Sequence, residues 1–200
     1  MVEKNLLRAA PLLPVLLVLP LLIFLGGLSA QTATPFETLN IGLRCVANTN
    51  RNVFHDFWAP GRGVDAFIGT PFYYGTVQAG FHTFPFYGRK TDISDFQTVF
   101  VYLKWGKRWS LLNELCWFGL VGVGGNIMIF ETEWRYSRYE SELGMSLDSG
   151  VSYTVHGNMA INFSGSYNII FTSKQIRLMF LSAGVSYSLS TPGWLKAFLE

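Results

Sequence analysis

The chain has 200 residues, which is enough for a single domain once any targeting segment is removed. Only 14% of its residues are charged, compared with roughly 25% in an ordinary soluble domain, while 50% are hydrophobic and 16% aromatic. This balance favours a surface that contacts lipid. The net charge of +2, without a Lys/Arg run longer than a pair, argues against a nucleic-acid partner.

Residues 1–30 differ sharply from the rest of the chain and have the features of a secretory signal peptide. Lys4 and Arg8 form a basic start, an apolar run follows over 9–28, and Ala30 provides a small residue at the cleavage position. The alternative is a retained membrane anchor, because the apolar run is long for a signal peptide. No basic cluster follows the run, and three prolines interrupt it, which favours cleavage: Pro11, Pro14 and Pro20.

The mature chain begins with a short lead-in at 31–35 and contains no apolar stretch near the ~20 residues that a spanning helix requires. Further membrane contact is therefore expected from strands. The first strand is predicted over 39–48, where the side chains alternate with a period of two. One face carries Leu39, Ile41, Leu43, Cys45 and Ala47, and the other carries Asn40, Gly42, Arg44 and Asn48.

The middle of the chain alternates less clearly. Strands are predicted over 64–69, 76–82 and 98–105. Their polar faces include Asp65, His82 and Lys104. The stretch 115–128 is apolar and rich in glycine, so we expect a strand there without being able to assign its two faces.

The last three strands, predicted over 142–155, 159–171 and 179–190, carry the strongest alternation. In the final strand one face is Met179, Leu181, Ala183, Val185, Tyr187 and Leu189. Apart from Phe180, the other face is small and polar: Ser182, Gly184, Ser186, Ser188 and Ser190. One apolar and one polar face are typical of an antiparallel sheet that borders an apolar phase on one side.

Together these segments give eight strands of roughly ten residues, the length that a tilted strand needs to cross a bilayer. The sequence therefore predicts an all-β fold, an eight-stranded antiparallel up-and-down transmembrane β-barrel over residues 36–190. If the chain starts in the periplasm, the connections at 49–62, 88–95, 130–141 and 172–175 lie outside. Those at 71–74, 106–113 and 156–158 then lie inside.

A soluble, lipocalin-like barrel is the main architectural alternative, because it too has alternating strands. Its apolar face points inward, and its polar face is wetted by bulk water. Soluble surfaces are rich in Lys and Glu, whereas the polar face here consists mainly of Ser, Gly, Asn and Thr. Such small side chains fit the narrow interior of an eight-stranded barrel, which favours apolar side chains facing lipid.

The pattern resembles that of the small eight-stranded outer-membrane barrels, the class that contains OmpX, OmpW and the membrane domain of OmpA. The segment Gly184-Val185-Ser186-Tyr187-Ser188-Leu189 is similar to the signal that the barrel-assembly machinery recognises. The resemblance implies export through the periplasm and a place in the outer membrane. Family members usually end directly after this strand, whereas this chain continues through a C-terminal extension at 191–200, which could form a short interfacial helix.

No catalytic, cofactor-binding or metal site is predicted, since HExxH, GxSxG, CxxC and glycine-rich phosphate loops are all absent from the sequence. Cys45 and Cys116 are expected to act as small hydrophobic residues in strands. A lipid-modifying enzyme would need a His with a Ser on the lipid-facing surface, whereas His82 is predicted to face the barrel interior.

Two groups of residues are candidates for a functional role. Charged side chains on the predicted interior face, which must pair or be solvated, form a candidate network of Arg44, Asp65, Lys104, Glu142 and Asp148. This network is either a gate on a narrow polar path or a plug that fixes the interior. An aromatic cluster in the first outer loop, formed by Phe54, His55, Phe57 and Trp58, either contacts an extracellular ligand or protein or folds over the barrel mouth.

These features predict a membrane barrel with a structural or surface-interaction role. The expected partners are the lipid bilayer, the barrel-assembly machinery and an extracellular ligand or protein, and no cofactor is expected. The alternatives are a narrow channel or a carrier of small hydrophobic ligands and, as a third class, a membrane-embedded lipid-modifying enzyme.

Overall fold

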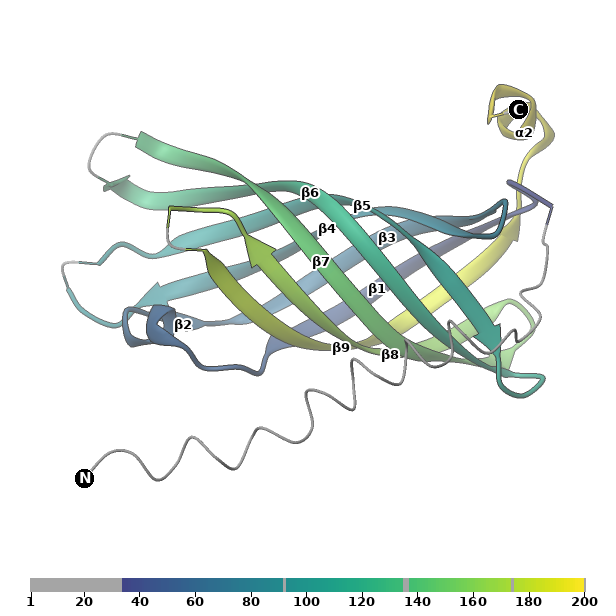
Figure 1. The fold of residues 1–200 in the computed structure, drawn as a ribbon, viewed down its shortest axis with the longest axis horizontal. Helices are drawn as coiled ribbons and strands as arrows, with labels where there is room; N and C mark the ends of the chain where they lie inside the picture. Colours follow the sequence, from purple (N-terminus) through teal and green to yellow (C-terminus); the bar gives the residue numbers. More distant parts are fainter. Residues whose placement is uncertain (1–33, 92, 135–136, 174, 200) are drawn as a thin grey trace.

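The computed structural model describes residues 34–199 except 92, 135–136 and 174. The predicted signal peptide at 1–30 therefore lies outside the described residues, as does most of the lead-in at 31–35. The described part is dominated by long strands that wind around a common axis (Figure 1). None of its helices has the length and hydropathy needed to cross a membrane.

Eight long strands form the wall of the molecule in the described part of the chain. They are β1 (Thr38–Asn48), β3 (Arg62–Phe72), β4 (Gly75–Gly88), β5 (Phe96–Ser110), β6 (Leu115–Trp134), β7 (Ser137–His156), β8 (Met159–Ile170) and β9 (Ile176–Ser190). Three short elements accompany them: the 3-10 helix η1 (Val53–Asp56), the strand β2 (Trp58–Pro60) and the helix α2 (Gly193–Leu199).

The wall closes on itself as an antiparallel barrel. Each long strand pairs with the preceding and following long strands, and β1 pairs with both β3 and β9. The closing seam between β1 and β9 runs from the pair Thr38–Ser190 to the pair Asn48–Phe180. Within the wall, closure gives each of the eight long strands a paired neighbour on both sides, which is the condition for strands to cross lipid. The predicted eight-stranded up-and-down barrel is confirmed.

The two ends of the barrel differ in the length of their connections. The termini end, where β1 begins and β9 ends, has short connections at 73–74, 111–114 and 157–158. The opposite end, called the loop end below, carries the longer segments at 49–61, 89–95 and 171–175. Two connections at the termini end are shorter than predicted, because β5 continues to Ser110 and β3 to Phe72.

The prediction of an outer loop at 130–141 is wrong, because most of that segment is strand. β6 runs to Trp134 and β7 starts at Ser137, with an irregular register between Ile129 and Trp134. The concentration of charge in this segment suggested a loop. Charged residues do indicate contact with water, but backbone pairing can continue beyond the barrel, and here the hairpin extends past the rim (Figure 1).

The segment at 115–128, whose faces the sequence did not distinguish, is the first part of β6 and has apolar side chains on both faces. Phe118, Leu120 and Met128 are buried inside the barrel, whereas Val121 and Val123 are exposed on the outside. Because both faces are apolar, the alternation of hydrophobicity that marks the other strands disappears. The sequence therefore could not show which residues face inward.

Candidate functional site

The outer surface of the barrel is an apolar belt. Every long strand contributes a large exposed apolar side chain: Leu43, Ile68, Phe81, Leu103, Val123, Leu143, Phe163 and Leu181. Burying one Leu or Phe side chain is favourable by about 1.5–3 kcal/mol, so a continuous belt of them in water would be strongly unfavourable. Outward-facing charges lie near strand ends, as at Lys107 and Arg177. The belt therefore fits an apolar solvent.

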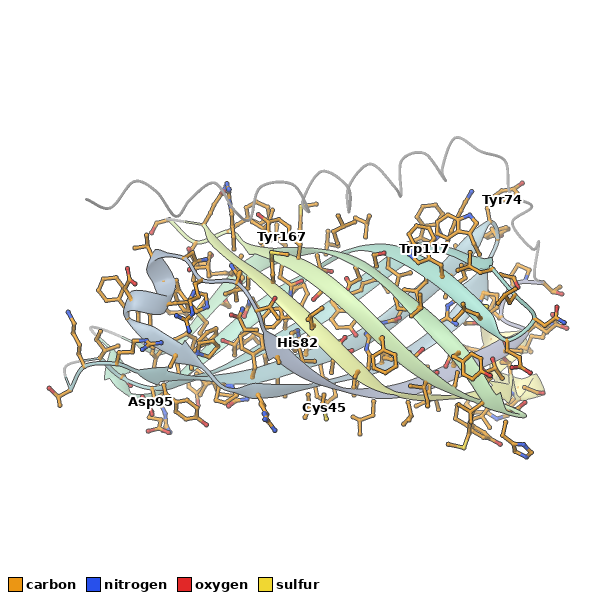
Figure 2. All side chains as sticks on the ribbon, turned by 90° about the horizontal axis from the view of Figure 1, so that it is seen from below. Cys45, Tyr74, His82, Asp95, Trp117 and Tyr167 are labelled. Atoms are coloured by element: carbon orange, nitrogen blue, oxygen red, sulfur yellow. The ribbon has the colours of Figure 1, made fainter. Side chains whose placement is uncertain are left out.

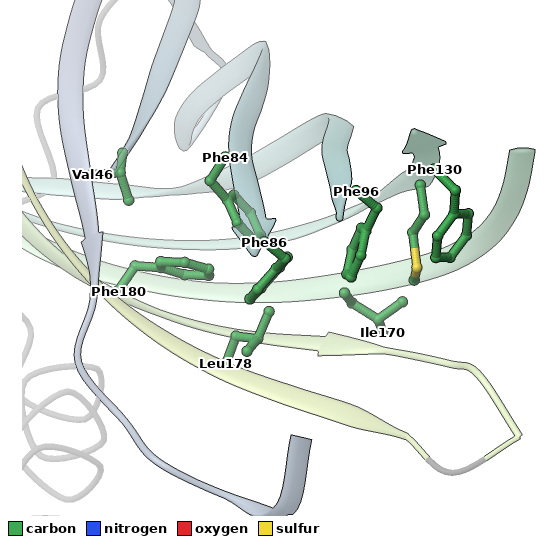
Figure 3. Packing of buried hydrophobic residues seen from close by; sticks show 9 residues of the cluster. Val46, Phe84, Phe86, Phe96, Phe130, Ile170, Leu178 and Phe180 are labelled. Atoms are coloured by element: carbon green, nitrogen blue, oxygen red, sulfur yellow. The ribbon is translucent and has the colours of Figure 1, made fainter. Parts of the chain in front are cut away.

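The interior at the loop end is filled by apolar side chains, which we call the apolar plug (Figure 3). Its members are Val46, Phe84, Phe86, Phe96, Met128, Phe130, Ile170, Leu178 and Phe180. The ring of Phe86 stacks on Phe96 at 4.9 Å between centroids and meets Phe84 edge-on at 5.0 Å. Small polar residues were expected to fill the interior; at this end the inward positions are instead large and apolar.

The loop at 49–61 closes the plug from outside. Phe54 of η1 stacks on Trp58 at 4.9 Å and meets Phe86 edge-on at 4.9 Å. The indole Nε1 of Trp58 donates to the Ser94 carbonyl at 3.1 Å, which ties this loop to the next one. Of the predicted aromatic cluster, Phe54 and Trp58 thus cover the barrel mouth, while Phe57 is exposed beside Lys90.

His55, the fourth member of that cluster, is buried and holds η1 in place. The Asn52 side chain accepts from the Phe54 N–H, and the Asn52 N–H donates to His55 Nδ1 at 3.1 Å, which completes a capping box. Nε2 of His55 lies 3.0 Å from the Asn48 side-chain oxygen. Burial lowers the pKa of His55, and the nearby Arg51 and Arg89 act in the same direction.

Three asparagines fix the start of this loop against β9. The side-chain amide groups of Asn48 and Asn50 donate to the carbonyls of Met179 and Arg177, at 3.1 and 3.0 Å. The Asn50 oxygen accepts from the Met179 N–H at 2.7 Å, and Asn52 donates to the Arg177 carbonyl at 2.6 Å. These amides replace backbone pairing beyond the end of β1, so the loop that carries the cover is anchored along the seam.

A first ion pair lies deeper in the barrel, on the neighbouring strands β1 and β3. Nε of Arg44 donates to Asp65 at 2.6 Å, and both side chains are buried. The second carboxylate oxygen of Asp65 accepts from the Tyr102 hydroxyl at 2.7 Å, and that hydroxyl in turn accepts from Gln78 at 3.2 Å. Arg44 also donates to Ser164 at 3.2 Å. The pair is therefore hydrogen-bonded on several sides, as a buried pair requires.

A second ion pair joins β5 to β7 across the intervening β6. Nζ of Lys104 lies 3.0 Å from Asp148 and 3.9 Å from the centre of the Tyr102 ring, so Tyr102 contacts both pairs. Gly122 of β6 makes this reach possible, because a Cβ there would lie 2.4 Å from Lys104 Cγ. We call these five residues the charged layer: Arg44, Asp65, Tyr102, Lys104 and Asp148.

Of the predicted network, four residues form the two pairs and Glu142 does not join them. Glu142 faces inward but is placed opposite Asn126, closer to the loop end, and is only partly buried. The fifth residue of the layer, Tyr102, was not singled out from the sequence, although it lies on the predicted inward face. An inward-facing Tyr two positions from Lys104 could have predicted this contact, because a buried tyrosine hydroxyl usually has a hydrogen-bond partner.

Phe67 is a further missed contributor. The Arg44 guanidinium lies 4.5 Å from the centre of its ring, and the ring covers Gly42, where a Cβ would lie 2.2 Å from it. Near the termini end, Arg108 lies 5.7 Å from the Phe118 ring, and its Nε has no hydrogen-bond partner among the described residues. No sequence pattern distinguished these inward residues from ordinary strand residues.

His82 lies inside the barrel between Phe84 and Phe180, at 4.8 and 4.7 Å between ring centres (Figure 2). It thus lies on the predicted interior side, away from the lipid-facing surface. Cys45 is exposed on the outer wall. In the part of the chain that the structure describes, no three His, Cys, Asp or Glu side chains come together as a metal site would require.

Little free space is left where the plug meets the polar part of the interior. A cavity of about 10 Å³ lies there, room for about one water molecule, between Phe84, Phe100 and Leu178 and the side chains of Asn126 and Asn168. A recess of about 160 Å³ lies at the loop-end rim, where Phe86, Phe96 and Phe130 meet Asp95, Glu131 and Arg138. The interior is therefore packed at two successive levels, the plug and the charged layer.

The sequence matches no protein-family model and no curated relative. Among solved structures, the chain is similar to Neisserial surface protein A (NspA), with a TM-score of 0.59 and 15% identity, over 78% of this chain and 99% of that one. It is also similar to the outer membrane protein Ail of Yersinia pestis in a phospholipid bilayer nanodisc, with a TM-score of 0.50 and 17% identity, over 76% of this chain and 99% of that one. The chain thus has the fold of the small outer-membrane barrels.

Proposed function

We propose that this chain is a non-conducting outer-membrane barrel with a structural or surface-interaction role, exported through the periplasm and presenting its loop end outside the cell. The observation that carries the proposal is the packed interior. Phe54 and Trp58 cover the apolar plug, and the charged layer fills the barrel below it. A solute would have to displace two levels of side chains in series.

The placement in a membrane is supported by the apolar belt and by the fold shared with NspA and Ail. The orientation follows from the connections, because such barrels keep short turns in the periplasm and longer loops outside. The termini end, with turns at 73–74 and 157–158, then faces the periplasm. Insertion by the barrel-assembly machinery, with β9 as the recognised strand, is part of the same proposal.

A surface role is supported by the chemistry of the loop end. Exposed side chains of both charges lie there: Arg51, Asp56, Arg89, Lys90, Arg138, Glu140 and Arg177. Arg51 and Asp56 stand on the 49–61 loop, which the side-chain amides of Asn48 and Asn52 and the indole of Trp58 hold in place, whereas Arg138, Glu140 and Arg177 lie near the ends of strands. A fixed, charged surface above a closed barrel is suited to contact with molecules outside the cell rather than to passage through it.

Conductance in planar bilayers tests the closed barrel. We expect no resolvable openings for the wild-type chain or for Arg44→Ala, because the plug remains when the ion pair is broken. Leu103→Ala, on the outer belt, is the matched control and is also expected to be silent. Openings in the wild-type chain would overturn the proposal, and openings only in Arg44→Ala would identify the charged layer as a gate.

Epitope insertion tests the orientation and placement. An epitope between Thr172 and Ser173, at the loop end, is expected to bind antibody on intact cells. An epitope after Asn158, at the termini end, is expected to bind only after the outer membrane is permeabilised. The protein is expected in the outer-membrane fraction, with faster gel mobility before heating. The reverse labelling pattern, or a water-soluble protein, would contradict the proposal.

A further inference from the structure

The helix α2 exposes an apolar face at the termini end of the barrel. Trp194 and Phe198 are 74% and 82% exposed, and they lie four residues apart, so they share one side of the helix. Ala197 is exposed as well, while Lys196 lies about 200° around the helix from Trp194. Two large aromatic side chains on one exposed face of a short helix are costly in water.

The position of α2 is restricted by a very short tether. The Thr191 N–H donates to the Glu37 carbonyl at 3.1 Å, directly before β1 begins, so residue 191 is fixed at the barrel rim. The helix then begins at Gly193, and its first turn is closed by the Leu195 and Lys196 N–H groups, which donate to the Pro192 carbonyl. Two residues span at most about 7 Å, so the start of α2 cannot leave the rim.

The apolar belt runs up to this point. Tyr187 and Leu189 of β9 are exposed on the outer wall, and Leu189 precedes Thr191 by two residues. The polar headgroup region extends the ~30 Å hydrocarbon core to about 40–45 Å, hence by several Å on each side. A helix whose first residue is tethered within about 7 Å of the rim therefore begins at the depth where Trp side chains concentrate in membrane proteins.

We propose that α2 is an interfacial anchor, which seats Trp194 and Phe198 in the lipid headgroup boundary of the periplasmic leaflet. The proposal rests on the membrane placement proposed above and extends it to the segment beyond the last strand. The occupant of the exposed face is lipid, because the face continues the apolar belt and the tether confines it to the rim. Short helices with an apolar face bind membrane interfaces in this way.

Site-specific fluorescence in vesicles tests the anchor. Both native thiols are replaced, Cys45→Ser and Cys116→Ser, and an environment-sensitive nitrobenzoxadiazole label is attached through Phe198→Cys, Lys196→Cys or Leu103→Cys. The full chain is placed in phosphatidylcholine vesicles with a lipid-borne quencher at a shallow or a deep acyl position. The Phe198 label is expected to emit at a shorter wavelength than the same label in water, and the shallow quencher is expected to reduce its intensity by at least about half.

The two other positions separate the possible outcomes. The Lys196 label, on the half-buried side of the helix, is expected to be quenched by neither lipid-borne quencher, and the Leu103 label, in mid-belt, is expected to be quenched by the deep quencher. A Phe198 label that reports water beside a quenched Leu103 label overturns the anchor and leaves the barrel proposal intact. A Phe198 label that is shielded but unquenched indicates cover by protein and also overturns the anchor. An unquenched Leu103 label overturns the membrane placement itself.

Discussion

In the loop half of the barrel, the inward positions of β4, β5 and β6 carry phenylalanine and methionine, whereas deeper inside β4 carries Gln78 and β5 carries Tyr102 and Lys104. The two regions fill the same narrow cylinder. The apolar plug is stabilised by dispersion forces and by burial of apolar surface. Both depend mainly on side-chain volume, so substitution by an apolar residue of similar size is tolerated. The charged layer is stabilised by ion pairs, each of which is favourable only while every partner is present.

The difference shows that a strand with apolar residues at its outward positions can carry either apolar or charged residues at its inward positions. Lipid contact fixes only what faces out. Inside, the plug seals the barrel at the loop end, and the charged layer ties β1, β3, β5 and β7 together through Arg44, Asp65, Lys104 and Asp148. Substitutions that change charge and substitutions that change volume should therefore have different consequences in the two regions.

The largest effect is expected for Asp65→Ala in the charged layer. It leaves Arg44 buried without a counter-charge and removes the acceptor of the Tyr102 hydroxyl. The expected loss is about 5 kcal/mol in the free energy of unfolding, the upper end for breaking a buried pair. Urea unfolding in vesicles, followed by gel mobility without heating, measures it. The double variant Arg44→Met/Asp65→Leu removes both charges and should lose less, and an equal or greater loss would contradict this account.

The next largest effect is expected for Phe86→Ala in the apolar plug. Phe86 contacts Phe54, Phe84 and Phe96 and is 1% exposed, so truncation leaves a cavity and costs about 3–4 kcal/mol. The same unfolding measurement applies. Phe86→Leu should cost less than about 1.5 kcal/mol, because the plug depends on volume rather than on specific partners. The exposed Phe57→Ala serves as the control, and a similar loss there would show that loop packing, not the plug, is measured.

A smaller effect is expected for Gly122→Ala, which probes how the second ion pair is built. The added methyl group would lie 2.4 Å from Lys104 Cγ and 2.9 Å from Ser146 Oγ, so Lys104 must move away from Asp148. The expected cost is about 1–3 kcal/mol. Gly125→Ala is the matched control on the same strand, because a Cβ there meets nothing within 4 Å. Equal losses in the two variants would show that Lys104 does not depend on the free space at residue 122.

The smallest effect, confined to the loop cover, is expected on acidification. Because burial lowers the pKa of His55, the unfolded loop binds a proton more readily than the folded one. The cover should keep its full stability above about pH 6.5, the ordinary histidine value, and lose stability as the pH falls toward the folded pKa. NMR titration of His55 and hydrogen exchange at Phe54 and Trp58 measure this. A midpoint above 6.5, or protection that does not change with pH, would contradict it.

The fold was predictable because lipid imposes a strict rule on one face. In β9, outward Leu181, Val185 and Leu189 alternate with small polar residues, and the same contrast marks β7 and β8. In β6 the plug residue Met128 and the inward Phe118 are as apolar as the outward Val121, so the contrast vanished. The extended hairpin could not be predicted for a related reason, since charged residues accompany exposure to water in paired strands as well as in loops.

The candidate site was only partly predictable. The inward faces of Arg44, Asp65, Lys104 and Asp148 followed from the alternation alone. Which of them meet depends on register and on the reach across β6, and neither can be derived from one strand at a time. Glu142 shares their face, but it lies nearer the loop end than the layer. In the outer loop, the aromatic content favoured a cover over the barrel mouth, yet only tertiary packing distinguishes half-buried Trp58 from exposed Phe57.

The seam between β1 and β9 has one further consequence. Its eleven pairs of residues, from Thr38–Ser190 to Asn48–Phe180, form a ladder like those between consecutive strands, and both ends of the barrel chain emerge side by side. The ring therefore has no structural first strand. A circularly permuted polypeptide, opened at Gly157–Asn158 and joined from residue 190 to residue 38 by a brief linker, would make the same contacts in a different genetic order.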